Sequence, residues 1–213
     1  MSERIAFIGH GRVGGTLADQ MQRIGHAVTI AHRGDPSASL DAALARNPGL
    51  AVASPEEAVE GAAIVVLATP FGANASALAP VAGLLAGRIL VDCTNPVGPG
   101  LTHGLGGERS GGEAVAALAR GARVVKAFSV YGAETLADPR GIGAAQAPMM
   151  PICGDDMDAV GRVAAIAGAM GWDPLPVGGL AQALHLEHMT LLWVRMVRAG
   201  GRSPRLAWAA LHG

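Results

Sequence analysis

A glycine-rich segment near the N-terminus constrains the fold of this chain more than any other feature. The segment reads Gly9-His-Gly11-Arg-Val-Gly14, and it lies between an apolar run typical of a strand and a helical pattern. In such a turn Gly9 permits the tight bend, Gly11 lets the backbone approach a pyrophosphate, and Gly14 allows close packing of helix and strand. An unrelated glycine-rich turn, or a flavin or methyltransferase site, would share part of this pattern. We predict a dinucleotide-binding loop made of these residues: Gly9, His10, Gly11, Arg12, Val13 and Gly14.

Runs of strand length alternate with helical patterns along most of the chain. Strands are expected at residues 4–8, 27–31, 50–53, 63–68, 88–92, 123–128, 149–152 and 174–177. Helices are expected at residues 13–23, 37–46, 110–120, 155–170 and 180–198, with others beginning after Ser54 and covering 203–211. Because several strands are apolar throughout, we predict an α/β fold with a Rossmann-type doubly wound parallel sheet. Residues 1–178 would form the NADP-binding domain, and residues 179–213 a helical C-terminal extension that packs on it.

The end of the second strand indicates which dinucleotide binds. An NAD site is expected to carry an acidic residue there, for the ribose 2′-hydroxyl. This chain has His32 and Arg33 at that place, and the first acid is Asp35. A guanidinium can pair with a 2′-phosphate through two parallel N–H bonds, and His32 could add a donor or stack. We therefore favour NADP(H), although Asp35 could instead reach the ribose.

Polar residues follow three further strands, where ligands of parallel sheets bind. Two of these segments are expected to border the cofactor's ribose, nicotinamide or carboxamide: Ala68, Thr69 and Pro70, and then Thr94, Asn95 and Pro96. The third offers an amine and two hydroxyls as candidate catalytic groups: Lys126, Ser129 and Tyr131. Each segment also has an ordinary structural explanation, because Thr-Pro and Asn-Pro often end strands and Lys126 could form a surface salt bridge.

Four segments together resemble one family: the glycine loop, Thr69-Pro70, Val91-Asp-Cys-Thr-Asn-Pro-Val-Gly98 and Val124-Val-Lys-Ala-Phe-Ser-Val-Tyr-Gly-Ala-Glu134. The chain resembles the NADP oxidoreductases related to coenzyme F420-dependent NADP reductase, over essentially its whole length. It also looks like the cytoplasmic domain of six-transmembrane ferric reductases, which uses a flavin. The resemblance implies NADPH at the glycine loop, Arg33 on the 2′-phosphate, and a second redox molecule near the nicotinamide. Family members often carry Asn where this chain has Ser129.

The leading functional hypothesis is an NADPH-dependent oxidoreductase that transfers a hydride between NADP(H) and a flavin, a deazaflavin such as F420, or another small acceptor. Such a transfer needs stacking and orientation more than acid–base groups. A reductase of a carbonyl or imine metabolite would need a proton donor, for which Tyr131 or Lys126 is the candidate. A non-catalytic NADP(H)-binding redox sensor is the third hypothesis.

Composition argues against several other classes of protein. With 16 basic and 17 acidic residues the net charge is −1, so nothing predicts attraction to nucleic acid or a membrane surface. Only 3% of the residues are aromatic, which disfavours base-stacking surfaces. No apolar run reaches the roughly 18 residues of a membrane span. Two cysteines form no disulfide framework, and a cytoplasmic location is expected.

Two further segments carry weaker predictions. The glycine-rich residues 98–112 are expected to form a mobile rim beside the acceptor site. The apolar helix at 180–198 predicts a homodimer, since it would be buried against a partner subunit. On that helix His185 and His188 share a face and Glu187 points away from it, so the spacing does not match a metal motif and no metal is predicted.

Overall fold

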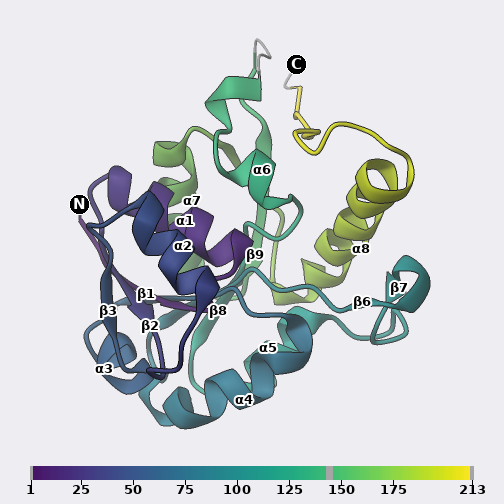
Figure 1. Ribbon diagram of the computed structural model, residues 1–213. Helices are drawn as coiled ribbons and strands as arrows, with labels where there is room; N and C mark the ends of the chain where they lie inside the picture. The colour runs from purple at the N-terminus through teal and green to yellow at the C-terminus, as the bar shows by residue number, and fades with distance from the viewer. Residues whose placement is uncertain (1, 143–145, 212–213) are drawn as a thin grey trace.

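One twisted sheet lies at the centre of the protein (Figure 1). The computed structural model describes residues 2–142 and 146–211. Within them eight strands form the sheet, in the order β10-β9-β8-β5-β4-β1-β2-β3. Their bounds are β1 Arg4–Ile8, β2 Ala27–Ala31, β3 Ala51–Ala53, β4 Ile64–Leu67, β5 Ile89–Asp92, β8 Arg123–Lys126, β9 Met149–Gly154 and β10 Asp173–Pro176. The strand order reverses between β1 and β4, as in doubly wound dinucleotide-binding sheets. The predicted fold class is confirmed.

Strand β9 departs from the parallel arrangement that we expected. It pairs antiparallel with β8, with Lys126 opposite Cys153, whereas every other pair in this sheet is parallel. The described part of the link from β8 to β9 holds only the short helix α6 (Ala133–Leu136) and a 3₁₀ turn (Arg140–Ile142). A parallel neighbour requires a crossover along one face of the sheet, and neither piece is long enough to make one. Strand β9 therefore enters at the carboxyl edge and runs back.

Helices cover both faces of the sheet. Figure 1 shows α1, α2 and α7 on one face and α3, α4 and α5 on the other. Their bounds are α1 Arg12–Arg23, α2 Ala38–Arg46, α3 Pro55–Glu60, α4 Asn74–Leu78, α5 Gly111–Leu118 and α7 Met157–Met170. Both predicted capping boxes form, with Ser54 and Ser110 each accepting from the backbone N–H of the glutamate three residues later. Because both faces are covered, every residue of β4 and β5 is buried, which accounts for the apolar sequence of β4 and of β5 up to Asp92.

The C-terminal segment packs beside α5 and the hairpin formed by β6 (Val97–Gly98) and β7 (Thr102–His103) (Figure 1). The expected long helix consists of a 3₁₀ turn (Leu180–Gln182), α8 (Ala183–Val194) and a π-helical turn (Arg195–Ala199). The prediction of a short helix at residues 203–211 is wrong, because the structure has no helix there.

The tail forms backbone contacts to the rest of the protein instead of a helix. The carbonyl of Trp208 accepts from the N–H of Met149, and the carbonyl of Leu206 accepts from Trp193 Nε1. Residues 1 and 143–145 of the predicted first domain and residues 212–213 of the predicted extension lie outside the described residues. The boundary between residues 178 and 179, and the mobility of residues 98–112, stay predictions.

Candidate functional site

The glycine loop between β1 and α1 uses its three glycines in different ways. Gly9 has a φ of +98°, and a Cβ on it would lie 2.7 Å from the carbonyl group of Ala68 after β4. A Cβ on Gly14 would lie 2.0 Å from the carbonyl oxygen of Gly9, so Gly14 permits α1 to pack against the loop. A Cβ on Gly11, in contrast, would meet no atom within 4 Å. Open space beside Gly11 leaves its backbone accessible to a ligand.

The first turn of α1 offers backbone N–H groups at the same place. Gly11 is the N-cap residue and supplies no side-chain cap, and the first turn holds no acidic residue. An uncapped helix start of this kind is suited to anion binding. The side chain of Arg12 points to α6, where its Nη2 donates to Glu134 at 2.5 Å, and Val13 packs against the core. At these two positions the backbone, not the side chain, is available to an anion.

A cavity of about 410 Å³ lies next to this loop, at the carboxyl ends of β1 and β2. The residues that line it are Ile8, Gly9, His10, Ala31, His32, Arg33, Asp35, Pro36, Ser37, Pro55, Thr69, Ala73, Ser76 and Ala77. The structure therefore brings five of the predicted cofactor residues, Gly9, His10, His32, Arg33 and Thr69, to one cavity. Asp35 lines it too, so both residues considered for the ribose are present.

Positive and neutral donors predominate around this cavity. Arg33 Nη2 donates to the carbonyl of Ser76 at 2.9 Å, which holds the guanidinium across the cavity's rim. The rings of His10 and His32 meet edge to face, with their centroids 5.4 Å apart. Burial and, secondarily, the neighbouring His32 lower the pKa of His10 below its ordinary value.

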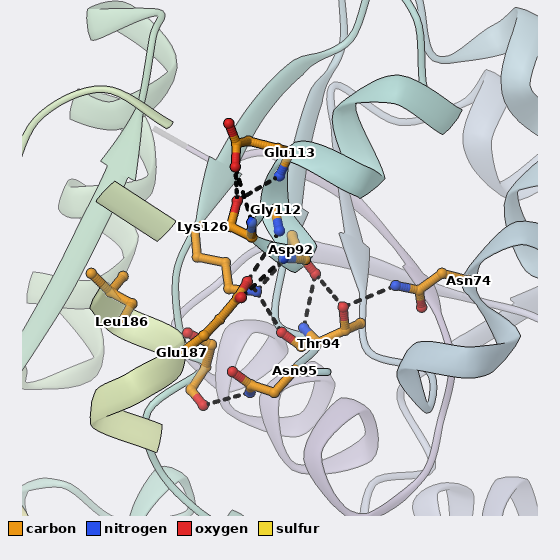
Figure 2. Close-up of polar contacts among 12 residues, drawn as sticks. Asn74, Asp92, Thr94, Asn95, Gly112, Glu113, Lys126, Leu186 and Glu187 are labelled. Atoms are coloured by element: carbon orange, nitrogen blue, oxygen red, sulfur yellow. Dashed lines mark hydrogen bonds and ion pairs between the residues drawn. The ribbon is translucent and has the colours of Figure 1, made fainter. Parts of the chain in front are cut away.

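A chain of hydrogen bonds joins the ends of β4 and β5, and Figure 2 shows its buried part from Asn74 through Thr94 to Asp92. Thr69 Oγ1 donates to Asn74 Oδ1 at 2.7 Å, and Asn74 Nδ2 donates to Thr94 Oγ1 at 2.9 Å. The hydroxyl of Thr94 in turn donates to Asp92 Oδ1 at 2.7 Å. Thr69 and Thr94, predicted at the cofactor, thus hold each other in place through Asn74. Sequence analysis missed Asn74, whose Pro-Phe-Gly-Ala context carried no recognisable signal.

Four ionisable side chains meet in the protein interior beyond this chain of hydrogen bonds (Figure 2 shows three of them). Lys126 Nζ lies 2.9 Å from Asp92 Oδ2 and 2.9 Å from Glu187 Oε1, and all three side chains are buried. Glu187 Oε2 lies 2.8 Å from His103 Nε2 on the β6–β7 hairpin. The backbone N–H groups of Gly111 and Gly112 also donate to Glu187, at 2.9 and 3.1 Å. This charge cluster (Asp92, His103, Lys126 and Glu187) joins the sheet, α5, α8 and the hairpin.

Within the charge cluster, burial and ion pairing act in opposite directions on the pKa values of Lys126 and Glu187. Burial by itself lowers the pKa of Lys126, but the carboxylates of Asp92 and Glu187 outweigh it and hold that pKa above the ordinary value. For Glu187 burial acts to raise the pKa, and Lys126 with the N–H of Gly111 brings it below the ordinary value. Lys126 is therefore a buried ammonium, neither the surface ion pair nor the accessible proton donor that the sequence suggested. Asp92, His103 and Glu187 were missed as partners, although a lone acid in an apolar helix was a usable signal for Glu187.

Ser129 and Asn95 lie side by side at the ends of β8 and β5. Asn95 Nδ2 donates to the carbonyl of Ser129 at 2.9 Å, and Thr190 Oγ1 on α8 donates to the same carbonyl at 3.1 Å. Phe128 has a φ of +55°, and this left-handed bend turns the chain just before Ser129. Asn95 Oδ1 and Ser129 Oγ are buried and have no partner among the described residues. Pro96 is buried next to them, and its carbonyl accepts from Gly104 of the hairpin at 2.5 Å.

Tyr131 is buried at some distance from the cavity. Its hydroxyl donates to the carbonyl of Met149 at 2.7 Å and accepts from the N–H of Trp208 at 3.3 Å. The ring stacks on Trp172, with centroids 5.1 Å apart. Burial raises the pKa of Tyr131 well above its ordinary range. In this structure the hydroxyl anchors the C-terminal tail to β9, and it does not line the cavity.

Pro70 and the cysteines complete the set of candidates. Pro70 is exposed and precedes the 3₁₀ turn Phe71–Ala73. Cys93 and Cys153 are buried free thiols, and burial raises the pKa of Cys153 to about 12. Within the described residues no group of three His, Cys, Asp or Glu side chains is placed to hold a metal ion. The same residues contain no helix long and apolar enough to cross a membrane.

Comparison with known proteins places these features in one family. The family model "NADP oxidoreductase coenzyme F420-dependent" matches residues 4–96, which include the glycine loop and the ends of β4 and β5. Metalloreductase STEAP3 of Rattus norvegicus is 35% identical over 191 residues, which are 88% of this chain and 36% of that protein. The chain thus spans about a third of the length of this curated relative.

Solved structures share the fold over nearly the whole chain. A protein of Arthrobacter sp. FB24, provisionally described as an F420-dependent NADP reductase, is 28% identical with a TM-score of 0.87, over 99% of this chain and 100% of the other. A reductive aminase of Aspergillus terreus, solved with NADPH and ethyl levulinate, has a TM-score of 0.68 over 94% of this chain and 63% of the other. Its identity is 18%, so this likeness concerns the fold alone. The chain is thus similar to coenzyme F420-dependent NADP oxidoreductases, over residues 4–96 in the family model and over nearly its whole length in fold.

Proposed function

We propose that this protein binds NADP(H) with the pyrophosphate at the start of α1 and the 2′-phosphate in the 410 Å³ cavity beside it. The single observation that carries the proposal is the combination of open backbone at Gly11 with Arg33 at the adjacent cavity. The residues present fit such a ligand. The start of α1 has no side-chain cap, and no protein atom lies within 4 Å of the position that a Cβ on Gly11 would take. Bound NADPH would supply a hydride, which no side chain of the protein can provide.

Arg33 and Gly11 test this proposal from two sides. Arg33→Ala removes hydrogen bonds to a charged group, worth about 1.5–3 kcal/mol, so NADP⁺ affinity should fall roughly 10-fold to 100-fold while NAD⁺ affinity stays the same. Gly11→Ala should weaken both dinucleotides, because its methyl group enters the free space at the backbone. The matched control is Gly161→Ala on α7, where a Cβ also meets no atom within 4 Å. Isothermal titration would contradict the proposal if NAD⁺ bound as tightly as NADP⁺, or if Arg33→Ala left NADP⁺ affinity unchanged.

The protein's own groups would act by binding and orientation. Backbone N–H groups of the loop and α1 would hold phosphates, and Thr69, fixed by Asn74, would stand at the cavity's inner wall. The nicotinamide half would be bordered by the ends of β4 and β5: Ala68, Thr69, Pro70, Thr94, Asn95 and Pro96. Asn95 Oδ1 and Ser129 Oγ are buried and have no hydrogen-bond partner among the described residues, so both could bond to a ligand at this edge.

For the acceptor we propose a flavin or a deazaflavin such as F420. Lys126 is locked between two carboxylates, and the Tyr131 hydroxyl is engaged with Met149, so neither is free to deliver a proton in this structure. A hydride transfer between two stacked redox rings does not need such a donor. We infer for Lys126 a positioning role and for Ser129 a binding role.

Stopped-flow oxidation of NADPH distinguishes the acceptors. The assay would offer F420, a flavin, a ferric chelate, and a panel of carbonyls and imines, and turnover is expected with the first two. Turnover with carbonyls or imines alone, abolished by Tyr131→Phe, would refute the proposal and favour the metabolite reductase. Tight NADPH binding without oxidation by any acceptor would instead identify a redox sensor.

We also propose that the protein is a homodimer that forms through α8. Leu192 is half exposed on that helix, and most residues of α8 are apolar. A monomeric mass by light scattering at micromolar concentration would remove this proposal. The cytoplasmic location stays a prediction from the sequence.

A further inference from the structure

Two histidines share the cavity with Arg33. His10 lies in the glycine loop after β1, and His32 directly follows β2, so two adjacent strand ends deliver both rings to one wall. The ring centroids are 5.4 Å apart, and an imidazole nitrogen of His10, Nδ1, lies 2.9 Å from Ser39 Oγ on α2. A hydroxyl can donate to a neutral imidazole or accept from a protonated one, so this contact can survive a change of charge on His10.

The charged groups around the pair are mostly cationic. Arg33 and Asp35, from the segment after β2, line the same cavity. Arg12 on α1 and Arg46 on α2 line a smaller cavity of about 100 Å³ that His10 also borders. From α3, from α4 and from the segment that links β4 to α4 come only uncharged groups: Pro55, Thr69, Ala73, Ser76 and Ala77. Such surroundings disfavour a positive charge on either imidazole until an anion arrives. Burial and, secondarily, His32 already lower the pKa of His10.

We propose that His10 and His32 form a pH-dependent part of the 2′-phosphate site, so that NADP(H) binding is accompanied by proton uptake that NAD(H) binding lacks. This inference rests on the proposed function, because it needs the 2′-phosphate in this cavity. A phosphate dianion beside an imidazole favours the imidazolium, as any nearby opposite charge does. The preference for NADP⁺ over NAD⁺ therefore increases as the pH falls from 8 to 6.5.

The direction of this change separates the histidine pair from Arg33 acting alone. An arginine keeps its charge over this range, whereas a phosphate monoester loses charge below its second pKa of about 6. A site built on arginine alone would thus show a constant preference between pH 8 and 6.5, and a falling one below that. Uptake of one proton changes affinity by up to roughly tenfold per pH unit.

The experiment measures the dissociation constants of NADP⁺ and NAD⁺, both stable in acid, between pH 6 and 8.5. We expect their ratio to shift roughly tenfold in favour of NADP⁺ between pH 8 and 6.5, for partial uptake of one to two protons. Titration calorimetry in buffers of different ionisation heat should detect proton uptake with NADP⁺ and none with NAD⁺. In the double variant His10→Asn/His32→Asn both effects should disappear, while Arg33 preserves a constant preference for NADP⁺. His26→Asn, at the amino end of the sheet, is the control and should behave as wild type.

Three results would overturn the inference, and they are distinguishable. A constant preference for NADP⁺ without proton uptake would refute the role of the histidine pair and leave the proposed function intact. Equal affinity for the two dinucleotides at every pH would refute both. A double variant that retains the wild-type pH dependence would also refute the histidine pair, and circular dichroism of that variant confirms that it is folded.

Discussion

Removing the charge of Lys126 should be one of the most destabilising single changes in this protein. In Lys126→Met a side chain of similar length replaces the ammonium that serves both Asp92 and Glu187, each 2.9 Å away. Breaking a buried ion pair by removing one partner costs about 3–5 kcal/mol, because the other charge stays buried. Two carboxylates lose their partner here. Asp92 keeps the N–H and hydroxyl of Thr94, and Glu187 keeps two backbone N–H groups, which limits the loss.

We therefore expect a loss of about 3–5 kcal/mol from a total that is about 5–15 kcal/mol in ordinary domains. For a chain of this size such a loss lowers the melting temperature by roughly 6–20 °C. Urea denaturation followed by far-UV circular dichroism at pH 7 gives the free energy of unfolding directly. The matched control is Arg123→Met at the other end of β8, whose ion pair with Asp158 is exposed and should contribute less than about 1 kcal/mol.

The pH dependence of the loss identifies its electrostatic origin. Below about pH 5 a stranded carboxylate can take up a proton, so the difference between Lys126→Met and wild type should shrink as the pH falls. A triple variant with Asp92→Asn, Lys126→Met and Glu187→Gln removes all three charges and should recover part of the stability. A cost below about 1 kcal/mol, or a cost that is the same at pH 7 and pH 4, would refute the electrostatic reasoning.

Three further changes have expected outcomes of different size. Gly14→Ala should leave little folded protein on expression, since its Cβ would lie 2.0 Å from the Gly9 carbonyl oxygen, and soluble yield relative to Gly161→Ala measures this. Ser110→Ala should cost about 1 kcal/mol in urea denaturation through loss of the α5 capping box, and an unchanged midpoint would contradict that role. Glu187 has a lowered pKa in the folded protein, so its stabilisation is present above the unfolded pKa of about 4.3 and is lost as the pH falls through the folded pKa. Glu187→Gln should therefore flatten the loss of stability below about pH 4, and an acid-unfolding curve with the wild-type slope would contradict this.

Local signals allowed the sequence to predict most of the fold and one half of the site. The capping boxes at Ser54 and Ser110 involve residues three apart, and the glycine loop lies within six residues, so their physics is visible in a short window. The same holds for Arg33, which is the second residue after β2. These features were predicted where the structure has them.

Long-range contacts account for what was not predicted. His103 and Glu187 are 84 residues apart in the chain, and no local pattern links them. The tail at 203–211 has a helical start signal, but the structure has no helix there. The carbonyl of Trp208 instead accepts from the N–H of Met149, and the carbonyl of Leu206 accepts from Trp193 Nε1. The antiparallel direction of β9 likewise depends on the path of the link between β8 and β9, and tertiary packing rather than local sequence sets that path.

The charge cluster also explains why the dinucleotide should bind in one half of a sheet that is nearly symmetric. A doubly wound sheet presents helix starts at its carboxyl edge on both sides of the strand reversal, and each is a potential anion site. The start of α1 is uncapped. The start of α5 is filled, because Ser110 caps it and the Glu187 carboxylate accepts from Gly111 and Gly112. The protein thus supplies its own anion to the start of α5, and α8 is held there by the same contact, so of these two helix starts the one at α1 is left for a phosphate.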